Sequence, residues 1–106
     1  MNQIEITPQQ LKEKLDRGDT LLLLDVRTPE EWEFNRLTGA TLIPIEEIER
    51  RRGELSHDDE IVAYCHIGGR SLQVARYLQA YGYNAKSLNG GIDQWAEEID
   101  TTIPRY

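Results

Sequence analysis

The sequence predicts an α/β fold in which a parallel sheet carries helices on both of its faces. Segments typical of strands and of helices alternate along the whole chain, which is the pattern of parallel strands joined by helices. Residues 21–26 form a continuous apolar run that ends in charge, as expected for a strand buried on both faces. With 106 residues, the chain is expected to form one domain over residues 1–106.

The first strand and the first helix are predicted close to the N-terminus. Residues 4–6 are typical of a short strand. Thr7 can cap a helix, Pro8 suits its first turn, and Gln10 completes a capping box. Leu11 and Leu15 would share one face of this helix, and Gly18 would end it.

The second strand, 21–26, is followed by another capping-box pattern. Thr28-Pro29-Glu30-Glu31 has the same arrangement as the first cap, so we expect a short helix that continues through Trp32 and Phe34. A third strand is expected at 41–43. A third helix would carry Ile45, Ile48 and Leu55, with Gly53 near its end.

The second half of the chain repeats the alternation. Residues 60–65 predict a fourth strand, and a helix is expected from about Ser71, where Val74, Ala75, Leu78 and Tyr81 share a face and Gly82 ends it. Residues 84–88 predict the fifth strand. The last helix is indicated by an apolar stripe of Ile92, Trp95, Ala96 and Ile99.

Charge and composition exclude several classes of function. Nineteen acidic and twelve basic residues give a net charge of -7, which argues against nucleic acid or an anionic membrane as a partner. A single cysteine allows no internal disulfide and fits a reducing compartment. No signal peptide is visible, and the longest apolar run, 21–24, is too short to cross a bilayer, so we expect a cytoplasmic protein.

The loop that follows the fourth strand combines a cysteine, two glycines and an arginine. In a parallel α/β sheet, ligands bind at the carboxyl ends of the strands, where Cys65 is expected. Glycines allow several main-chain N–H groups to point inward, and the start of the next helix adds its positive dipole end. Together with Arg70, these features favour an anionic sulfur, which is the reactive form of a cysteine.

The residues alone leave two interpretations of Cys65 open. A lone cysteine at the end of a buried strand is commonly a small core residue, whereas the Gly68-Gly69-Arg70 loop favours a nucleophile. His66 is expected to line the rim or to face solvent. One cysteine and two histidines are too few for a zinc site, so no metal is expected.

Three motifs in order resemble the rhodanese family. These are Leu23-Leu24-Asp25-Val26-Arg27-Thr28-Pro29-Glu30-Glu31-Trp32, Cys65-His66-Ile67-Gly68-Gly69-Arg70-Ser71, and Leu88-Asn89-Gly90-Gly91-Ile92-Asp93-Gln94-Trp95. The resemblance covers 4–106. It implies a three-layer α/β/α fold with five parallel strands in the order 1-5-4-2-3.

The same resemblance implies the roles of the site residues. Cys65 would be the sulfur-carrying nucleophile, and His66, Ile67, Gly68, Gly69, Arg70 and Ser71 would form the cradle of its persulfide. Asp25 and Arg27 would flank and support this loop. The family usually has a histidine where this sequence has Arg36, so Arg36 either adds positive charge at the rim or faces solvent.

The resemblance therefore predicts a sulfurtransferase that needs no cofactor. The donor would be a small anion such as thiosulfate, or a protein persulfide. The acceptor would be a thiol, cyanide or a carrier protein. The segment 95–106 is similar to the end of rhodanese domains fused to adenylating enzymes, which favours a sulfur-carrier protein as a partner.

Two other functions are compatible with the sequence. Related folds include cysteine-dependent phosphatases and arsenate reductases, but these resemble Cys, five residues, then Arg, whereas Cys65 and Arg70 bracket only four. A shorter loop suits a sulfur atom better than a phosphoryl group. A non-catalytic rhodanese-like binding module is the other alternative, although such modules typically lose the cysteine.

Overall fold

A five-stranded parallel sheet forms the centre of the computed structural model, which describes residues 3–106. The strands are β1 (Glu5–Ile6), β2 (Leu22–Asp25), β3 (Thr41–Leu42), β4 (Glu60–Tyr64) and β5 (Asn84–Leu88). Their order is β1-β5-β4-β2-β3, as the resemblance to the rhodanese family implies. The mixed α/β architecture and the parallel pairing are therefore confirmed.

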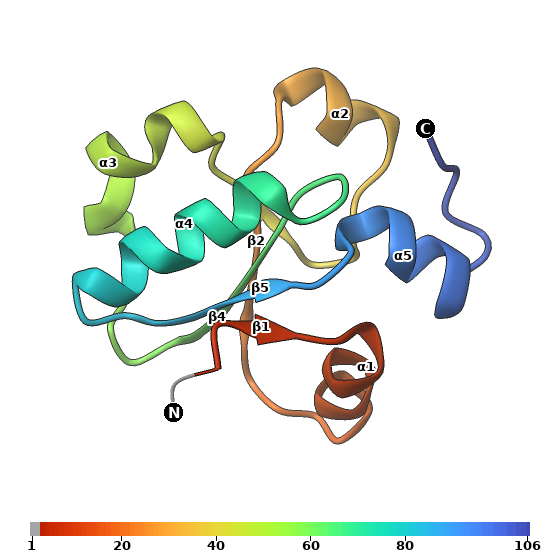
Figure 1. The fold of residues 1–106 in the computed structure, drawn as a ribbon, viewed down its shortest axis with the longest axis horizontal. Helices are drawn as coiled ribbons and strands as arrows, with labels where there is room; N and C mark the ends of the chain where they lie inside the picture. The colour runs from red at the N-terminus through yellow and green to blue at the C-terminus, as the bar shows by residue number, and fades with distance from the viewer. Residues whose placement is uncertain (1–2) are drawn as a thin grey trace.

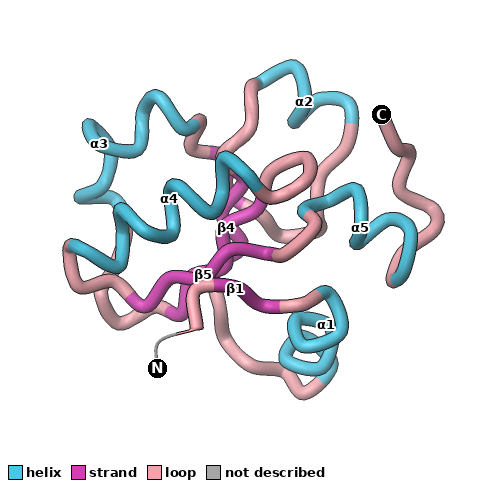
Figure 2. Tube along the Cα trace, in the orientation of Figure 1, coloured by secondary structure: helices cyan, strands magenta, loops and turns pink. Residues whose placement is uncertain are grey.

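The helices cover both faces of the sheet and complete the three layers (Figures 1 and 2). They are α1 (Pro8–Asp16), α2 (Pro29–Phe34), α3 (Ile48–Arg51), α4 (Gly69–Ala80) and α5 (Gly91–Glu98). Figure 2 shows α3 and α4 on one side of the strands and α1 and α5 on the other. None of the helices in residues 3–106 is long and apolar enough to span a membrane.

Two capping boxes start helices where the sequence predicts them. The side chain of Thr7 accepts a hydrogen bond from the N–H of Gln10, whose own side chain accepts from the N–H of Thr7. Thr28 and Glu31 form the same reciprocal pair at the start of α2. Each box satisfies two donors that would otherwise lack a partner at a helix N-terminus.

The expected third helix is not continuous. A 3₁₀ turn at Ile45–Glu47, the single α-helical turn of α3, and a second 3₁₀ turn at Arg52–Glu54 replace it. Short segments tolerate the tighter 3₁₀ geometry, which here turns Ile45 and Ile48 toward the core. The sequence pattern is correct about which residues face the core and wrong about the regular helix.

Two further expectations about α4 need correction. The helix begins at Gly69, two residues before the predicted Ser71, because Gly68 adopts a left-handed conformation with φ of 116° and serves as the cap. Tyr81 follows the last turn and is exposed rather than part of the buried stripe. Ser71 consequently lies in the first turn of α4.

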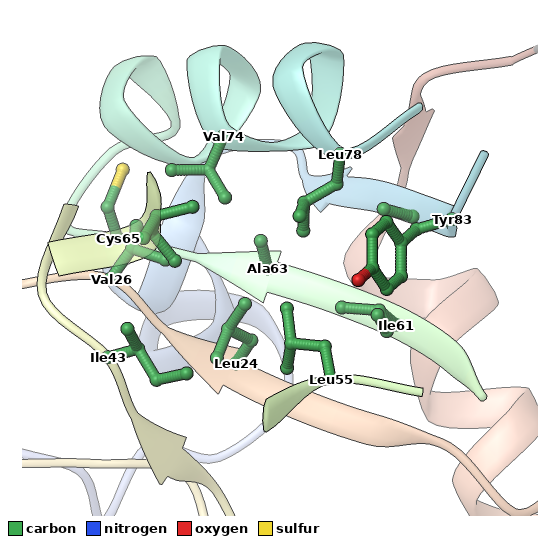
Figure 3. Close-up of a cluster of buried hydrophobic side chains, with 12 residues drawn as sticks. Leu24, Val26, Ile43, Leu55, Ile61, Ala63, Cys65, Val74, Leu78 and Tyr83 are labelled. Atoms are coloured by element: carbon green, nitrogen blue, oxygen red, sulfur yellow. The ribbon is translucent and has the colours of Figure 1, made fainter. Parts of the chain in front are cut away.

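Alternation along β4 divides its side chains between two hydrophobic clusters. Ile61, Ala63 and Cys65 lie on the α3–α4 side, and Val62 and Tyr64 lie on the α1–α5 side. Figure 3 shows the first cluster, in which Cys65 lies at one end. Cys65 therefore directly follows a buried, packed strand.

Candidate active site

The carboxyl ends of β2 and β4 lie side by side and bring three predicted site residues together. Asp25 is paired in register with Tyr64, so Cys65 directly follows the strand that neighbours Asp25 and Arg27. The N–H of Val26 donates to the carbonyl of Tyr64 over 3.1 Å and extends the contact between the two strands. The sheet topology therefore places Asp25 and Arg27 beside the Cys65 loop.

The sulfur of Cys65 accepts hydrogen bonds from the loop that follows it. The N–H of Gly68 lies 3.1 Å from Sγ, and the N–H of Ser71 lies 3.4 Å from it. The hydroxyl of Ser71 is also 3.4 Å from Sγ. Figure 3 shows the sulfur next to the first turn of the helix that carries Val74 and Leu78. Two main-chain N–H groups and one hydroxyl therefore lie within 3.4 Å of the sulfur, and Cys65 is only 1% exposed.

Ser71 connects the sulfur to a second buried hydroxyl. Its Oγ lies 2.7 Å from the Oγ of Ser87 and 3.3 Å from the carbonyl of Gly68, which accepts from it. Both serines are fully buried. Because Ser71 has one hydroxyl proton, the bond to Gly68 and a bond to the Cys65 sulfur compete for it, and the N–H groups of Gly68 and Ser71 are the two main-chain donors to the sulfur.

The start of α5 holds the main chain of the cysteine loop. The N–H of Ile92 donates to the carbonyl of Cys65 over 2.9 Å, and the N–H of Asp93 donates to that of His66 over 3.0 Å. Gly91 permits this approach, because a Cβ there would lie 2.6 Å from the carbonyl oxygen of Cys65 and closer still to that of His66. The glycine pair 90–91 therefore packs against the active-site loop.

Arg70 does not stand alone at the rim, contrary to its expected role as a free positive charge. Its guanidinium makes two hydrogen bonds to the carboxylate of Glu31, at 2.7 and 3.0 Å. These bonds hold the pKa of the Glu31 carboxyl well below its ordinary range. They also raise the pKa of Arg70, to which the nearby Cys65 contributes a smaller effect.

Tyr106 joins the same network from the far end of the chain. Its hydroxyl donates to Glu31 over 2.5 Å and accepts from Arg27 over 2.9 Å. Burial and the bond to Glu31 raise the pKa of Tyr106 to about 12. Its ring also stacks on that of His66, with centroids 4.0 Å apart, and its main-chain oxygen lies 2.7 Å from Nε2 of His66.

Asp25 and Arg27 form a fully buried ion pair. Arg27 donates to both carboxylate oxygens of Asp25, through Nε at 2.9 Å and through a terminal nitrogen at 2.7 Å. Its terminal nitrogens also donate to the side chain and carbonyl of Asn35, each over 2.7 Å. Burial alone would lower the pKa of Arg27, but Asp25 and Tyr106 outweigh it and raise the pKa above its ordinary value.

Arg36 lies apart from this network. Its side chain is exposed, and its guanidinium carbon lies 4.4 Å from the centroid of the Trp32 ring. No hydrogen bond joins it to the Cys65 loop in the described part of the chain. Within residues 3–106, no three histidine, cysteine, aspartate or glutamate side chains gather in a way that could hold a metal.

The match to known proteins decides the family. A model of the rhodanese-like domain matches residues 7–98. The chain belongs to the rhodanese family. The fold, the strand order and the three sequence motifs that resemble this family are all consistent with that assignment.

Relatives of this rhodanese-like domain include enzymes named for sulfur transfer. It is 37% identical over 93 residues to a sulfurtransferase of Allochromatium vinosum, covering 87% of both chains. It is 38% identical over 104 residues to the probable adenylyltransferase/sulfurtransferase MoeZ of Mycobacterium tuberculosis, covering 95% of this chain and 26% of MoeZ. The homologues thus support a sulfurtransferase-type enzyme.

Two further comparisons bear on fold and length. The domain is 40% identical over 98 residues to the putative sulfur carrier protein YrkF of Bacillus subtilis, covering 91% of this chain and 52% of YrkF. It therefore spans about a quarter of MoeZ and about half of YrkF. The crystal structure of a rhodanese-related protein from Thermoplasma volcanium superposes with a TM-score of 0.83, at 30% identity, over 90% of this chain and 92% of that one.

Four residues of the site are not identified by the sequence patterns. Those patterns place Glu31 in a capping box and Gly91 in the third rhodanese-like motif without a role at the site, and they assign no role to Ser87 or Tyr106. The position of Ser87 next to the end of β5 is the one available signal, because that end lies beside the cysteine loop. The contacts of Glu31 and Tyr106 depend on tertiary structure.

Proposed function

We propose that this domain carries a sulfane sulfur as a persulfide on Cys65. The donor is thiosulfate or a persulfide on a protein, and the acceptor is a thiol, cyanide or a sulfur-carrier protein. One observation supports this most strongly: the N–H groups of Gly68 and Ser71 donate to the sulfur of Cys65, and the hydroxyl of Ser71 lies 3.4 Å from it. Such donors stabilise a thiolate, which is the attacking species, and a persulfide anion after it.

The proposed cycle has two half-reactions. The Cys65 thiolate attacks the outer sulfur of the donor, a new S–S bond forms, and the donor's own bond to that sulfur breaks. The leaving group departs with the electron pair, as sulfite from thiosulfate or as a thiolate from a persulfide. The acceptor then attacks the terminal sulfur and restores the Cys65 thiolate. This is covalent catalysis, which predicts ping-pong kinetics and needs no cofactor.

The loop geometry also favours a small cargo. A persulfide bond is about 2 Å long, so the outer sulfur extends that far beyond Sγ toward the mouth of the loop. The inner sulfur would keep its bonds to the N–H groups of Gly68 and Ser71. We propose that His66, Ile67, Gly69 and Arg70 line this second position.

A sulfur-carrier protein is the proposed partner on the acceptor side. The names of MoeZ and YrkF refer to adenylyl transfer, sulfur transfer and sulfur carriage, and both proteins contain a region similar to this chain. A domain that passes its sulfur to a separate carrier fits these relationships.

The phosphatase alternative is less well supported. A phosphate-binding loop needs its arginine to face the anion, and Arg70 makes both of its hydrogen bonds to Glu31 instead. A non-catalytic binding module would have no need for two main-chain donors directed at the cysteine sulfur. Neither alternative has an observation in its favour that the sulfurtransferase proposal lacks.

Intact mass spectrometry tests the proposal. We expect the protein to gain the mass of one sulfur atom when it is incubated with thiosulfate or with a persulfide donor, and to lose it when cyanide is added. Cys65→Ser should gain nothing. Identical masses for the wild type and Cys65→Ser with every donor would refute the catalytic assignment, whereas turnover of arsenate or phosphate esters would support the phosphatase alternative.

A further inference from the structure

The positive charges nearest to Cys65 are already neutralised by carboxylates of the protein. Arg27 is bound to Asp25 at 2.7 Å with both side chains fully buried. Arg70 is bound to Glu31 at 2.7 Å through two hydrogen bonds. The four side chains together carry no net charge, so neither arginine presents an unopposed cation to an incoming anion.

Most other charges in the segments next to the loop are negative or also paired; Arg36, which lies over the Trp32 ring, is the exception. Helix α2 adds the exposed carboxylates of Glu30 and Glu33 beside Glu31. Arg105, near Tyr106, binds Asp93 through two hydrogen bonds of 2.9 and 3.0 Å. The whole chain carries a charge of -7. A dianion therefore approaches Cys65 against a repulsive field that extends over about 10 Å at 0.1 M salt.

The rim exposes apolar side chains instead of cations. Ile67, next to His66 in the loop, is 66% exposed, Phe34 is 51% exposed, and Tyr106 is 45% exposed. The rings of Phe34 and Tyr106 meet edge to face, with centroids 5.5 Å apart. Figure 1 shows the C-terminal segment that carries Tyr106 beside α2 and α5. Such a rim can pack against carbon substituents of a substrate.

From this arrangement, and resting on the proposed function, we infer that the sulfur donor is an organic persulfide, R–S–S⁻. We further infer that Glu31 disfavours thiosulfate by neutralising Arg70. The Cys65 thiolate attacks the outer sulfur, the bond between the two donor sulfurs breaks, and R–S⁻ leaves with the electron pair and takes a proton from solvent. In this step the donor brings one negative charge into the site, and the leaving thiolate carries one negative charge out.

Thiosulfate brings more negative charge into the same site than a persulfide does. It enters with two negative charges and leaves as sulfite, also with two, beside a thiolate that is itself negative. An unopposed cation would stabilise that leaving group, and the bidentate bond from Arg70 to Glu31 neutralises the nearby arginine. The apolar side chains of the rim carry no positive charge that could offset the two negative charges of a dianion.

The chain itself provides a conservative way to test Glu31. Glutamine occupies the equivalent third position of the α1 capping box at Gln10, so Glu31→Gln should retain the cap of α2. It also keeps an oxygen that can accept from Tyr106. The substitution removes the negative charge and leaves Arg70 in place. Glu33→Gln is the matched control, because Glu33 is exposed on the same helix.

The experiment measures the rate at which Cys65 gains sulfur, by intact mass, with three donors. These are thiosulfate, N-acetylcysteamine persulfide, whose only charge is the persulfide, and a persulfidated serum albumin. We expect the wild type to load faster from either persulfide than from thiosulfate. The comparison of the small and protein persulfides identifies which source is preferred.

The variants then test the role of Glu31. Glu31→Gln should raise the rate constant with thiosulfate on the order of 10-fold, with a smaller gain at high salt, while the persulfide rates change by less than about 3-fold. Glu33→Gln should change all rates by less than about 2-fold. Equal loading of the wild type from thiosulfate, or no gain in Glu31→Gln, overturns this inference. Failure of Cys65 to load from all three donors instead overturns the proposed function.

Discussion

The N–H of Ile92 donates to the carbonyl oxygen of Cys65 over 2.9 Å, which joins the first turn of α5 to the residue that carries the sulfur. Asp93 makes the equivalent bond to His66. These two bonds hold the carbonyls of Cys65 and His66 against α5 and so fix the main chain at the start of the loop. The third sequence motif is therefore a support for the second, and its glycines permit the close contact.

Gly91→Ala should disrupt the loop by steric overlap. The added Cβ would contact the carbonyls of Cys65 and His66, and the φ of 62° is itself unfavourable for alanine. We expect a loss of about 1–3 kcal/mol in the free energy of unfolding and a sulfur-loading rate below about a tenth of the wild-type rate. Denaturant unfolding and intact mass measure both.

Gly53→Ala is the control for this substitution. A Cβ added at Gly53 would have no neighbour within 4 Å, and this glycine lies outside both the cysteine loop and α5. The substitution should leave loading unchanged. Normal loading by Gly91→Ala would show that the contact between α5 and the loop does not shape the site.

The hydroxyl of Ser71 should contribute to the reactivity of Cys65. It lies 3.4 Å from Sγ and is oriented by Ser87 at 2.7 Å. A hydrogen bond to a charged group contributes about 1.5–3 kcal/mol, so Ser71→Ala should slow alkylation of Cys65 at neutral pH on the order of 10-fold. Ser87→Ala retains the Ser71 hydroxyl and should have a smaller effect. Equal rates in the wild type and Ser71→Ala would remove the hydroxyl from this role.

The ion pair of Asp25 and Arg27 should act mainly on stability. Arg27→Met leaves the carboxylate of Asp25 buried without its cation, which should cost about 3–5 kcal/mol in the free energy of unfolding. The double variant Asp25→Leu/Arg27→Met removes both charges and should recover much of this loss. A single variant as stable as the wild type would mean that the pair is not needed to hold the ends of β2 and α2.

Acid should weaken the contribution of Glu31 to stability. Hydrogen bonds from Arg70 and Tyr106 lower the pKa of Glu31 in the folded state. The contribution is therefore fully present above the unfolded pKa of about 4.3 and is lost as pH falls toward the lower folded value. The difference in unfolding free energy between the wild type and Glu31→Gln, about 1 kcal/mol, should stay constant from pH 7 to about 4.5 and then shrink.

Urea unfolding at a series of pH values measures this difference. Glu33→Gln, with an exposed side chain on the same helix, should be close to the wild type throughout. A difference for Glu31→Gln that persists unchanged to pH 3 would contradict the assigned pairing with Arg70.

Local sequence patterns are sufficient to predict the alternating strands and helices, whereas the strand order follows from the resemblance to the rhodanese family. Capping boxes at Thr7 and Thr28 place two helix starts, because a cap depends on residues only three apart. The four leucines 21–24 indicate a buried strand because adjacent residues of a strand face opposite sides of the sheet. The mostly apolar run 60–65 likewise predicts a strand that ends at Cys65.

Contacts between distant segments are beyond such patterns. Glu31 and Arg70 are separated by 39 residues, and Tyr106 lies 75 residues from Glu31, so no local spacing relates them. The sequence analysis therefore treats Arg70 as an unpaired positive charge, whereas in the structure Glu31 neutralises it. The broken third helix escapes prediction for a related reason, since packing of Ile45 and Ile48 on the sheet selects 3₁₀ turns that propensities do not indicate.

The most direct measurement of the central claim locates the transferred sulfur on the chain. Protein loaded with the persulfide donor, freed of excess donor and digested with trypsin, yields the peptide 53–70, which contains the single cysteine. We expect this peptide to carry one additional sulfur atom, and we expect loaded protein to pass that sulfur to an added thiol or cyanide. A peptide 53–70 of unchanged mass after every donor would contradict a Cys65 persulfide.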